Sequence, residues 1–278
     1  MTASIPDLLR AGADLRLADV DPDATPGVDE DKDDGERALR HGAARLAELQ
    51  ELLFANGTHG DGRRVLLVLQ AMDTAGKGGI VQHVVGAANP EGMHVHAFKA
   101  PTEEERAHDF LWRVRRELPG AGMIGVFDRS HYEDVLIHRV RGLSPAEVIE
   151  ERYGVIRDFE AELAAAGTTI VKVMLHISSE EQRQRLSDRL DDPSKHWKYS
   201  PGDLDERLLW DDYMAAYELA IRRTTTEAAP WFVVPANRKW YARLAVQTLL
   251  VDALERLDQH WPPADFDVAA EKARLAVS

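Results

Sequence analysis

Residues 70–79 of this chain read QAMDTAGKGG, and this stretch decides the fold. It follows the apolar run VLLVL at residues 65–69, which predicts a buried strand, and precedes IVQHVVGAA at residues 80–88, which predicts a helix. A strand, a glycine-rich loop and a helix form a phosphate-binding loop, because backbone N–H groups and the helix dipole both favour an anion at the helix N-terminus. Lys77 would add a mobile cation for the phosphate that is transferred.

The loop departs from the usual phosphate-loop pattern, G-x-x-x-x-G-K-[ST], in two places and carries an unexpected acid. Ala71 stands where the pattern has its first glycine, and Gly78 stands where a serine or threonine would ligate magnesium. Asp73 would repel bound phosphate, so its carboxylate makes sense if it holds a metal ion or a substrate proton. The alternative interpretation is an ordinary glycine-rich turn with an exposed lysine.

Composition sets limits on partners and location. The net charge of −14 argues against broad nonspecific binding to nucleic acid. The chain has no cysteine, which excludes disulfides and thiolate metal sites. No apolar run approaches the ~20 residues that span a bilayer, and the N-terminal residues lack the pattern of a secretory signal. We therefore expect a cytoplasmic protein that binds neither membranes nor nucleic acid.

The domain organisation is predicted to be simple. Residues 19–37, DVDPDATPGVDEDKDDGER, are acidic and include two prolines, which is typical of mobile or solvated chain. We assign residues 1–36 to an acidic, flexible N-terminal segment and residues 37–278 to a single domain.

Predicted strands alternate with predicted helices about five times along the chain. The strands are expected at residues 65–69, 93–98, 123–127, 169–177 and 231–234. This alternation predicts an α/β fold, with a parallel sheet covered by helices on both faces. Ligands of such sheets bind beyond the carboxyl ends of the strands, which is where the glycine loop lies.

A second motif, VFDRSHYEDVLIHRV at residues 126–140, ends another predicted strand with Asp128 and Arg129. An aspartate at the end of a neighbouring strand is the usual partner of a phosphate loop, because it positions magnesium directly or through water. Taken alone, such an aspartate is more often a helix cap. Since Gly78 cannot offer a hydroxyl to the metal, Asp73 and Asp128 are the expected carboxylate ligands of Mg²⁺, with Mn²⁺ as the other candidate.

A basic segment, RQRLSDRLDDPSKHWKYSPGD at residues 183–203, follows the fourth predicted strand. Arg185 and Arg189 are four residues apart and are expected to share a helix face. The segment is either a solvated helix with a loop or a helical lid, spanning about residues 183–215, that closes on phosphates with arginine forks. Its position after a phosphate-loop core favours the lid.

Three stretches in this order, QAMDTAGKGG, FDRSHYED and DDPSKHWKYSPGD, resemble the polyphosphate kinase family 2, a phosphate-loop kinase family. The resemblance covers roughly residues 38–257. It implies a fold similar to thymidylate kinase, and Mg²⁺-dependent transfer of phosphate between inorganic polyphosphate and nucleotides. SHYEDV resembles the subgroup that accepts both nucleoside monophosphates and diphosphates, so AMP and ADP are expected acceptors and guanine nucleotides are further candidates. Family members are commonly dimers or tetramers, which implies a homo-oligomer.

The resemblance also assigns roles to residues. The family's loop aspartate and lysine fall on Asp73 and Lys77, and the aspartate and arginine of its second motif fall on Asp128 and Arg129; these four are the expected catalytic residues. The expected phosphate- and polyphosphate-binding residues are Ala75, Gly76, Lys77, Gly78, Gly79, Arg129, Arg185, Arg189, Lys195 and Lys198. The expected nucleotide contacts, which could instead pack or begin a helix, are Tyr132, Glu133 and Asp134.

Two other functions stay open at this point. The first is an ATP-dependent nucleoside monophosphate kinase on the same core, which differs in its phosphate donor. The second is a nucleotide-binding regulator without catalytic activity. Against the regulator stand Asp73, Lys77, Asp128 and Arg129, because a catalytically silent protein would have little reason to keep all four residue types in place.

Overall fold

A computed structural model describes residues 3–29 and 31–278 of the chain. Its centre is a five-stranded parallel sheet in the order β2-β3-β1-β4-β5, which confirms the predicted fold class. The strands are β1 (Arg64–Ala71), β2 (Met93–Ala97), β3 (Ile124–Asp128), β4 (Thr168–His176) and β5 (Trp231–Pro235). Because β1 lies in the middle, with β3 and β4 as neighbours, the loop that follows it is placed at the centre of the sheet edge.

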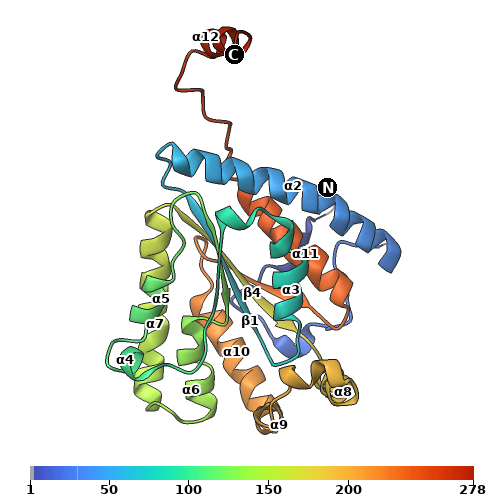
Figure 1. The fold of residues 1–278 in the computed structure, drawn as a ribbon. Helices are drawn as coiled ribbons and strands as arrows, with labels where there is room; N and C mark the ends of the chain where they lie inside the picture. The colour runs from blue at the N-terminus through green and yellow to red at the C-terminus, as the bar shows by residue number, and fades with distance from the viewer. Residues whose placement is uncertain (1–2, 30) are drawn as a thin grey trace.

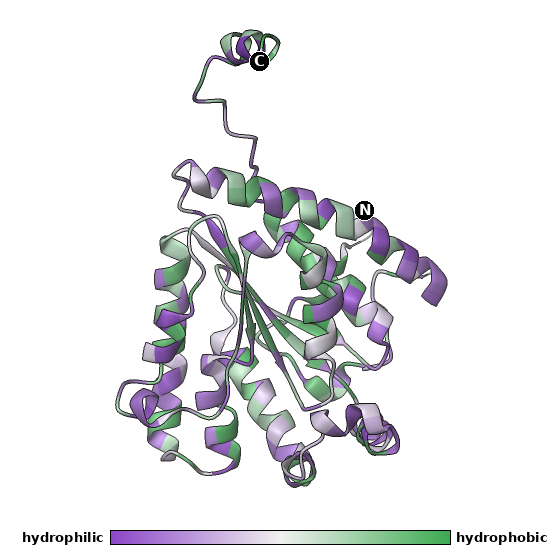
Figure 2. Ribbon diagram, viewed as in Figure 1, coloured by the Kyte–Doolittle hydropathy of each residue, from purple (hydrophilic) through white to green (hydrophobic). Residues whose placement is uncertain are grey.

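Helices cover both faces of the sheet (Figure 1). One face carries α2 (Lys32–Thr58), α3 (Lys77–His83) and α11 (Lys239–Glu255), and the other carries α5 (Trp112–Arg116), α7 (Ala146–Ala165) and α10 (Trp210–Thr224). In the ribbon of Figure 2 the hydrophobic residues of these helices (green) lie mostly along the sides that face the sheet, and the hydrophilic residues (purple) lie mostly on the outer sides. Double coverage explains why β1 reads as a continuous apolar run, with the side chains of residues 65–69 at most 1% exposed.

The N-terminal segment differs from the prediction of a flexible chain over residues 1–36. From α1 (Ile5–Leu9) onward it runs along the body, and Leu9 and Leu17 are buried. Ala11 donates its N–H to the carbonyl oxygen of Trp231 at 2.8 Å, and the Tyr241 hydroxyl donates to the carbonyl oxygen of Pro26 at 2.8 Å. These contacts tie the described part of the segment to β5 and α11, while residues 1, 2 and 30 lie outside the described residues.

The acidic residues of this segment also have a structural role. Asp31 caps α2, and its carboxylate accepts hydrogen bonds from the N–H groups of Asp33 and Asp34 at 2.9 and 3.1 Å. Acidic side chains are favourable in the first turn of a helix because of the helix dipole. A cluster of acids that composition alone assigns to mobile chain is therefore partly a helix start.

A helical segment lies beyond the carboxyl ends of β4 and β1 (Figure 1). It consists of α8 (Ser179–Asp191), a 3₁₀ helix (Pro193–Lys198) and α9 (Gly202–Arg207). We call residues 179–207 the lid segment. The predicted lid extended to about residue 215, but α10 begins at Trp210 and buries Tyr213 and Ala216 against the sheet, so residues 210–215 belong to the body. No helix in the described ranges combines the length and the apolar character that crossing a membrane requires.

Candidate active site

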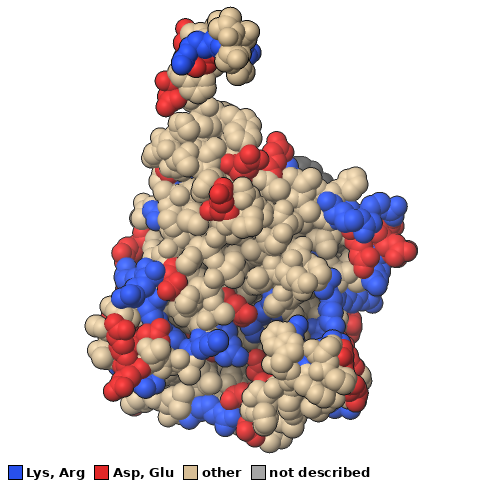
Figure 3. Space-filling view, in the orientation of Figure 1, with Lys and Arg blue, Asp and Glu red and all other residues tan. Residues whose placement is uncertain are grey.

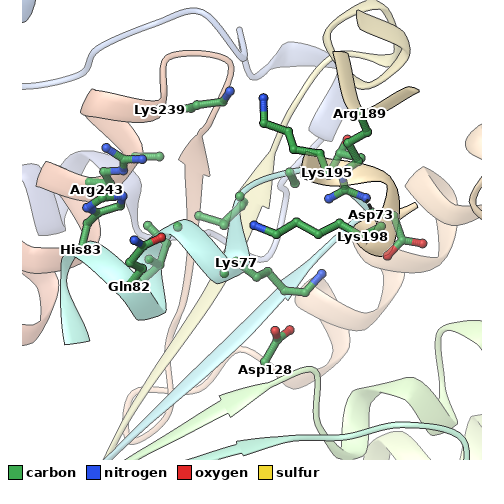
Figure 4. A pocket seen from close by; sticks show the side chains of 18 of the residues that line it. Asp73, Lys77, Gln82, His83, Asp128, Arg189, Lys195, Lys198, Lys239 and Arg243 are labelled. Atoms are coloured by element: carbon green, nitrogen blue, oxygen red, sulfur yellow. Dashed lines mark hydrogen bonds between the residues drawn. The ribbon is translucent and has the colours of Figure 1, made fainter. Parts of the chain in front are cut away.

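A cavity of about 790 Å³ opens between the glycine loop, the lid segment and the first turns of α11 (Figure 4). Its lining brings together most of the predicted site residues, namely Asp73, Ala75, Gly76, Lys77, Gly78, Gly79, Asp128, Arg129, Arg189, Lys195 and Lys198. Figure 3 shows lysine and arginine side chains gathered in the hollow beside the lid segment, although the chain as a whole carries a net charge of −14.

The glycine loop presents its backbone to this cavity. Gly76 is the N-cap of α3 and has φ +119°, a left-handed conformation that favours glycine. The N–H groups of Gly76, Lys77 and Gly78 have no acceptor within the described chain, so they are free to bind an anion. A Cβ at Gly78 would meet nothing within 4 Å, so packing does not demand glycine there and the absent hydroxyl leaves open space.

Lys77 begins α3, and its side chain is only 9% exposed. Its ammonium group donates a hydrogen bond to the carbonyl oxygen of Ala71 at 3.2 Å. An ammonium group has three donors, so this bond holds the side chain in place and leaves two donors for phosphate oxygens.

Arg129 and Asp73 form an ion pair between the two motifs, with Nη2 of the arginine 2.9 Å from Oδ1 of the aspartate. Arg129 has φ +65°, which is unusual outside glycine, and its N–H donates to the carbonyl oxygen of Leu69 at 3.0 Å. Burial alone would lower the pKa of Arg129, but the carboxylates of Glu133 and Asp73 raise it above its usual range. The guanidinium is therefore a permanent cation.

Asp128 ends β3 beside this pair and lines the same cavity. Across residues 3–29 and 31–278, its carboxylate has no hydrogen-bond or ion-pair partner. This partly buried carboxylate lies among cations and is available to a metal ion.

The predicted nucleotide contacts lie elsewhere. Tyr132 is fully buried, and its hydroxyl donates to the carboxylate of Glu160 at 2.8 Å and accepts from the ammonium group of Lys172 at 3.0 Å. Asp134 is buried too, with Arg113 and Arg152 at 3.8 and 3.7 Å. Neither lines the cavity, so both hold the turn after Asp128 rather than face a ligand. Their assignment as nucleotide contacts does not match these positions.

Glu133 keeps a place near the charged groups of the site. Burial raises the pKa of its carboxyl group, and the cations Arg129 and Lys77 oppose that rise. Of the three predicted nucleotide contacts, Glu133 is therefore the one whose carboxyl group interacts electrostatically with Arg129 and with Lys77 of the glycine loop.

Three of the four predicted lid cations face the cavity. Arg189 donates to the carbonyl oxygen of Lys198 at 3.0 Å and lies 3.4 Å from the carboxylate of Asp203. Lys195 pairs with Asp192 at 2.8 Å. The Lys198 ammonium lies over the ring of Trp197, which is 78% exposed.

Arg185 does not face the cavity, contrary to its assignment as a polyphosphate ligand. Its side chain is buried, and its guanidinium donates to four carbonyl oxygens. The acceptors are Thr74 at 3.1 Å, Ala75 at 3.0 Å, Ala236 at 2.7 Å and Asn237 at 2.9 Å. Arg185 therefore fastens the back of the glycine loop to α8 and to the start of α11.

The cavity also contains residues that no motif indicated. Gln82 and His83 come from α3, and Lys239 and Arg243 come from the first turns of α11 (Figure 4). Burial and the charge of Arg243 lower the pKa of His83. The only sequence signal for the two cations is their spacing of four residues at the start of the last large helix, which is too common to indicate a site.

Comparisons with known proteins agree with this geometry. The model of the family described as Polyphosphate kinase 2 (PPK2) matches residues 29–262. The AMP/ADP-polyphosphate phosphotransferase of Meiothermus ruber is 50% identical over 258 residues, covering 93% of this chain and 94% of that protein. The ADP-polyphosphate phosphotransferase of Rhodopseudomonas palustris is 45% identical, covering 84% and 83%. The crystal structure of polyphosphate kinase 2 from Arthrobacter aurescens TC1 is 62% identical and superposes with a TM-score of 0.98 over 100% of this chain and 98% of that chain. The resemblance drawn from the three motifs is confirmed.

Proposed function

This chain belongs to the polyphosphate kinase 2 family, and we propose that it transfers phosphate between inorganic polyphosphate and AMP or ADP. The two relatives described above are named as polyphosphate phosphotransferases, one for AMP and ADP and the other for ADP. An ATP-dependent monophosphate kinase and a non-catalytic regulator are not favoured by those names. The use of AMP as an acceptor is the more specific part of the proposal, because only one of the two names includes AMP.

One observation supports a polyanionic donor above all. The cavity is lined by seven lysine and arginine side chains and three aspartates, although the whole chain is strongly acidic. The cations come from the glycine loop, the second motif, the lid segment and α11. Cations spread along an open cavity suit a ligand with many phosphates better than a single monophosphate, since each phosphate needs its own neutralising contact. We assign Lys239 and Arg243 to the part of the polyphosphate beyond the reacting end.

We assign the metal site to Asp73 and Asp128, with Mg²⁺ ahead of Mn²⁺. Both carboxylates line the cavity, and among the described residues that of Asp128 has no ion-pair partner. The described residues contain no group of three or more histidine, cysteine or acidic side chains able to hold a metal. A cation here would complete its shell with phosphate and water oxygens, which is how Mg²⁺ is usually bound. When bound, it would neutralise charge on the reacting phosphates.

The residues in place can perform the transfer without covalent help. The transition state of phosphoryl transfer is loose and spreads charge over three equatorial oxygens, so positioning and charge neutralisation dominate. The free N–H groups of residues 76–78 and the ammonium of Lys77 would hold the terminal phosphoryl group of polyphosphate. As its bond to the bridging oxygen breaks, a bond to a phosphate oxygen of the nucleotide forms. Arg129 would stabilise the charge that develops between them.

The donor assay tests the proposal. Purified protein with polyphosphate and either AMP or ADP, without ATP as donor, should form ADP and ATP in a Mg²⁺-dependent reaction. Arg243→Gln should raise the KM for polyphosphate while leaving the KM for the nucleotide unchanged. Arg256→Gln, which removes an exposed arginine paired with Asp252 outside the cavity, is the matched control. Phosphorylation of AMP by ATP but never by polyphosphate would refute the proposed donor.

Replacing Arg185 should affect catalysis rather than polyphosphate binding. Lysine keeps the charge but cannot satisfy four carbonyl oxygens, so Arg185→Lys should loosen the glycine loop. We expect kcat to fall by ~10–100-fold, since misplacing a reacting group by ~1 Å costs about that much, with little change in the KM for polyphosphate. Arg183→Lys is the control, because Arg183 is exposed and pairs with Glu180, at a distance from the glycine loop's contacts with Arg185. Unchanged kcat with a large rise in the KM for polyphosphate would instead make Arg185 a ligand of the donor.

A further inference from the structure

The last 18 residues of the chain, which we call the C-terminal arm (residues 261–278), stand away from the body (Figure 1). The chain is held as far as His260, whose carbonyl oxygen accepts a hydrogen bond from the side-chain amide of Asn56 at 3.0 Å. Within the described residues, every hydrogen bond and ion pair made by residues 262–278 has its partner in the arm itself, such as the pair of Arg274 with Glu271 at 2.6 Å. Beyond Trp261, the described part of the body therefore offers the arm no hydrogen-bond or ion-pair partner.

The arm exposes apolar side chains that folded chains normally cover. Phe266 is 59% exposed, Leu275 is 76% exposed and Val277 is 88% exposed. Its helix, α12 (Val268–Leu275), buries none of its residues. Isolated helices shorter than ~12–15 residues are marginal in water, so a helix of eight residues needs a surface to pack against.

The crystal structure from Arthrobacter aurescens TC1 provides independent support. The two structures superpose with a TM-score of 0.98 over 100% of this chain and 98% of that one. A score this high requires that the 18 residues of the arm superpose together with the rest of the chain. The arm of the relative thus follows the same path away from its own body. An arm without contacts to its own chain is ordered in a crystal only when another molecule holds it.

We propose that the C-terminal arm docks on a second copy of this chain, and that the exchange is reciprocal. A two-fold arrangement lets each copy cover the arm of the other with the same surface, so no further partner is needed. The arm leaves the molecule beside α2, where Trp261 lies near Leu49 and Leu52 in the second half of that helix. The partner copy would therefore sit against the layer formed by α2 and α11.

A groove in that layer offers a receiving surface. It has a volume of about 540 Å³ and lies beside the first half of α2, with Ile5, Val28, Leu244 and Val251 among its lining. If two copies of α2 lie antiparallel, the arm root at the second half of one helix faces the groove at the first half of the other. The arm is long enough for this reach, because six extended residues and an eight-residue helix span ~30 Å.

Solution mass tests the exchange independently of activity. Full-length protein should be an oligomer at micromolar concentration, and Phe266→Asp combined with Leu275→Asp should lower its mass to that of a smaller species. Lys272→Gln changes an exposed charge of the same helix and should leave the mass unchanged. Equal masses for the wild type and the double variant, with both folded by circular dichroism, would overturn the proposal. Because mass is measured without substrate, a failed donor assay would not affect this result.

A cross-linking experiment tests the receiving groove. The chain has no cysteine, so introduced thiols have no background. A mixture of Ala276→Cys protein with Thr248→Cys protein, mildly oxidised, should give a covalent dimer that neither protein gives alone, since Thr248 lines the groove. A mass change in the Asp variants without this cross-link would place the arm on another surface of the partner and overturn the groove assignment.

Discussion

Replacing Lys77 with methionine should lower kcat by about 10²–10³-fold while leaving the protein folded. Lys77 is the only lysine of the glycine loop, and its side chain is almost fully buried at the N-terminus of α3. A cation that stabilises charge in the transition state cannot be replaced by solvent, because the site excludes most water from that position. Methionine keeps the length of the side chain, so the loss would report the charge rather than a cavity.

The measurement is steady-state turnover with polyphosphate and ADP, accompanied by a thermal melt. The matched control is Lys32→Met in the exposed first turn of α2, which should behave as wild type. Near-normal turnover of a well-folded Lys77→Met protein would show that the glycine loop is not the centre of the reaction.

Replacing Asp128 with asparagine should raise the Mg²⁺ requirement by at least ~10-fold or stop turnover, because asparagine keeps the shape of the side chain but loses its charge. Asp128 is expected to be more sensitive than Asp73, whose carboxylate is already shared with Arg129 at 2.9 Å. Asp73→Asn should shift the Mg²⁺ titration in the same direction, since the usual hydroxyl ligand is absent at Gly78.

Titration of activity with MgCl₂ at saturating polyphosphate and nucleotide separates these effects. The matched control is Asp203→Asn, because Asp203 is the third aspartate of the cavity but belongs to the lid segment and lies 3.4 Å from Arg189. Its titration should stay close to that of the wild type. If Asp73→Asn and Asp128→Asn also titrate as the wild type does, the metal is bound elsewhere.

The parts of the site that could be predicted from sequence are those set by local patterns. An apolar run of five residues, the glycines of the loop and the aspartate at the end of the next strand fix β1, α3 and β3 through neighbours in sequence. The alternation of strands and helices then requires a parallel sheet, so the glycine loop and Asp128 meet at one edge. These elements depend little on distant residues, which is why their prediction is confirmed.

The parts of the structure that the sequence did not predict correctly depend on contacts between distant segments of the chain. Arg185 and Arg189 occupy similar positions on α8, yet the loop after β5 offers two carbonyl oxygens to Arg185 and the lid segment offers one to Arg189. Within α8, Arg185 pairs with Glu181 at 2.7 Å and Arg189 lies in the last turn, but neither feature tells which of the two faces the cavity. The N-terminal segment was predicted flexible from its acids, but Leu9 and Leu17 anchor it, and two scattered leucines carry no periodic signal.

The ion pair between Asp73 and Arg129 has a consequence for how ligands bind at the site. Each side chain occupies the position that a ligand of the other would need: the carboxylate stands in for phosphate at the guanidinium, and the guanidinium stands in for a cation at the carboxylate. Phosphate that takes over Arg129 releases Asp73 for a cation, and a cation on Asp73 releases Arg129 for phosphate. Binding of the two should thus be mutually reinforcing, and free phosphate alone, which brings no cation with it, would have to break the pair without compensation.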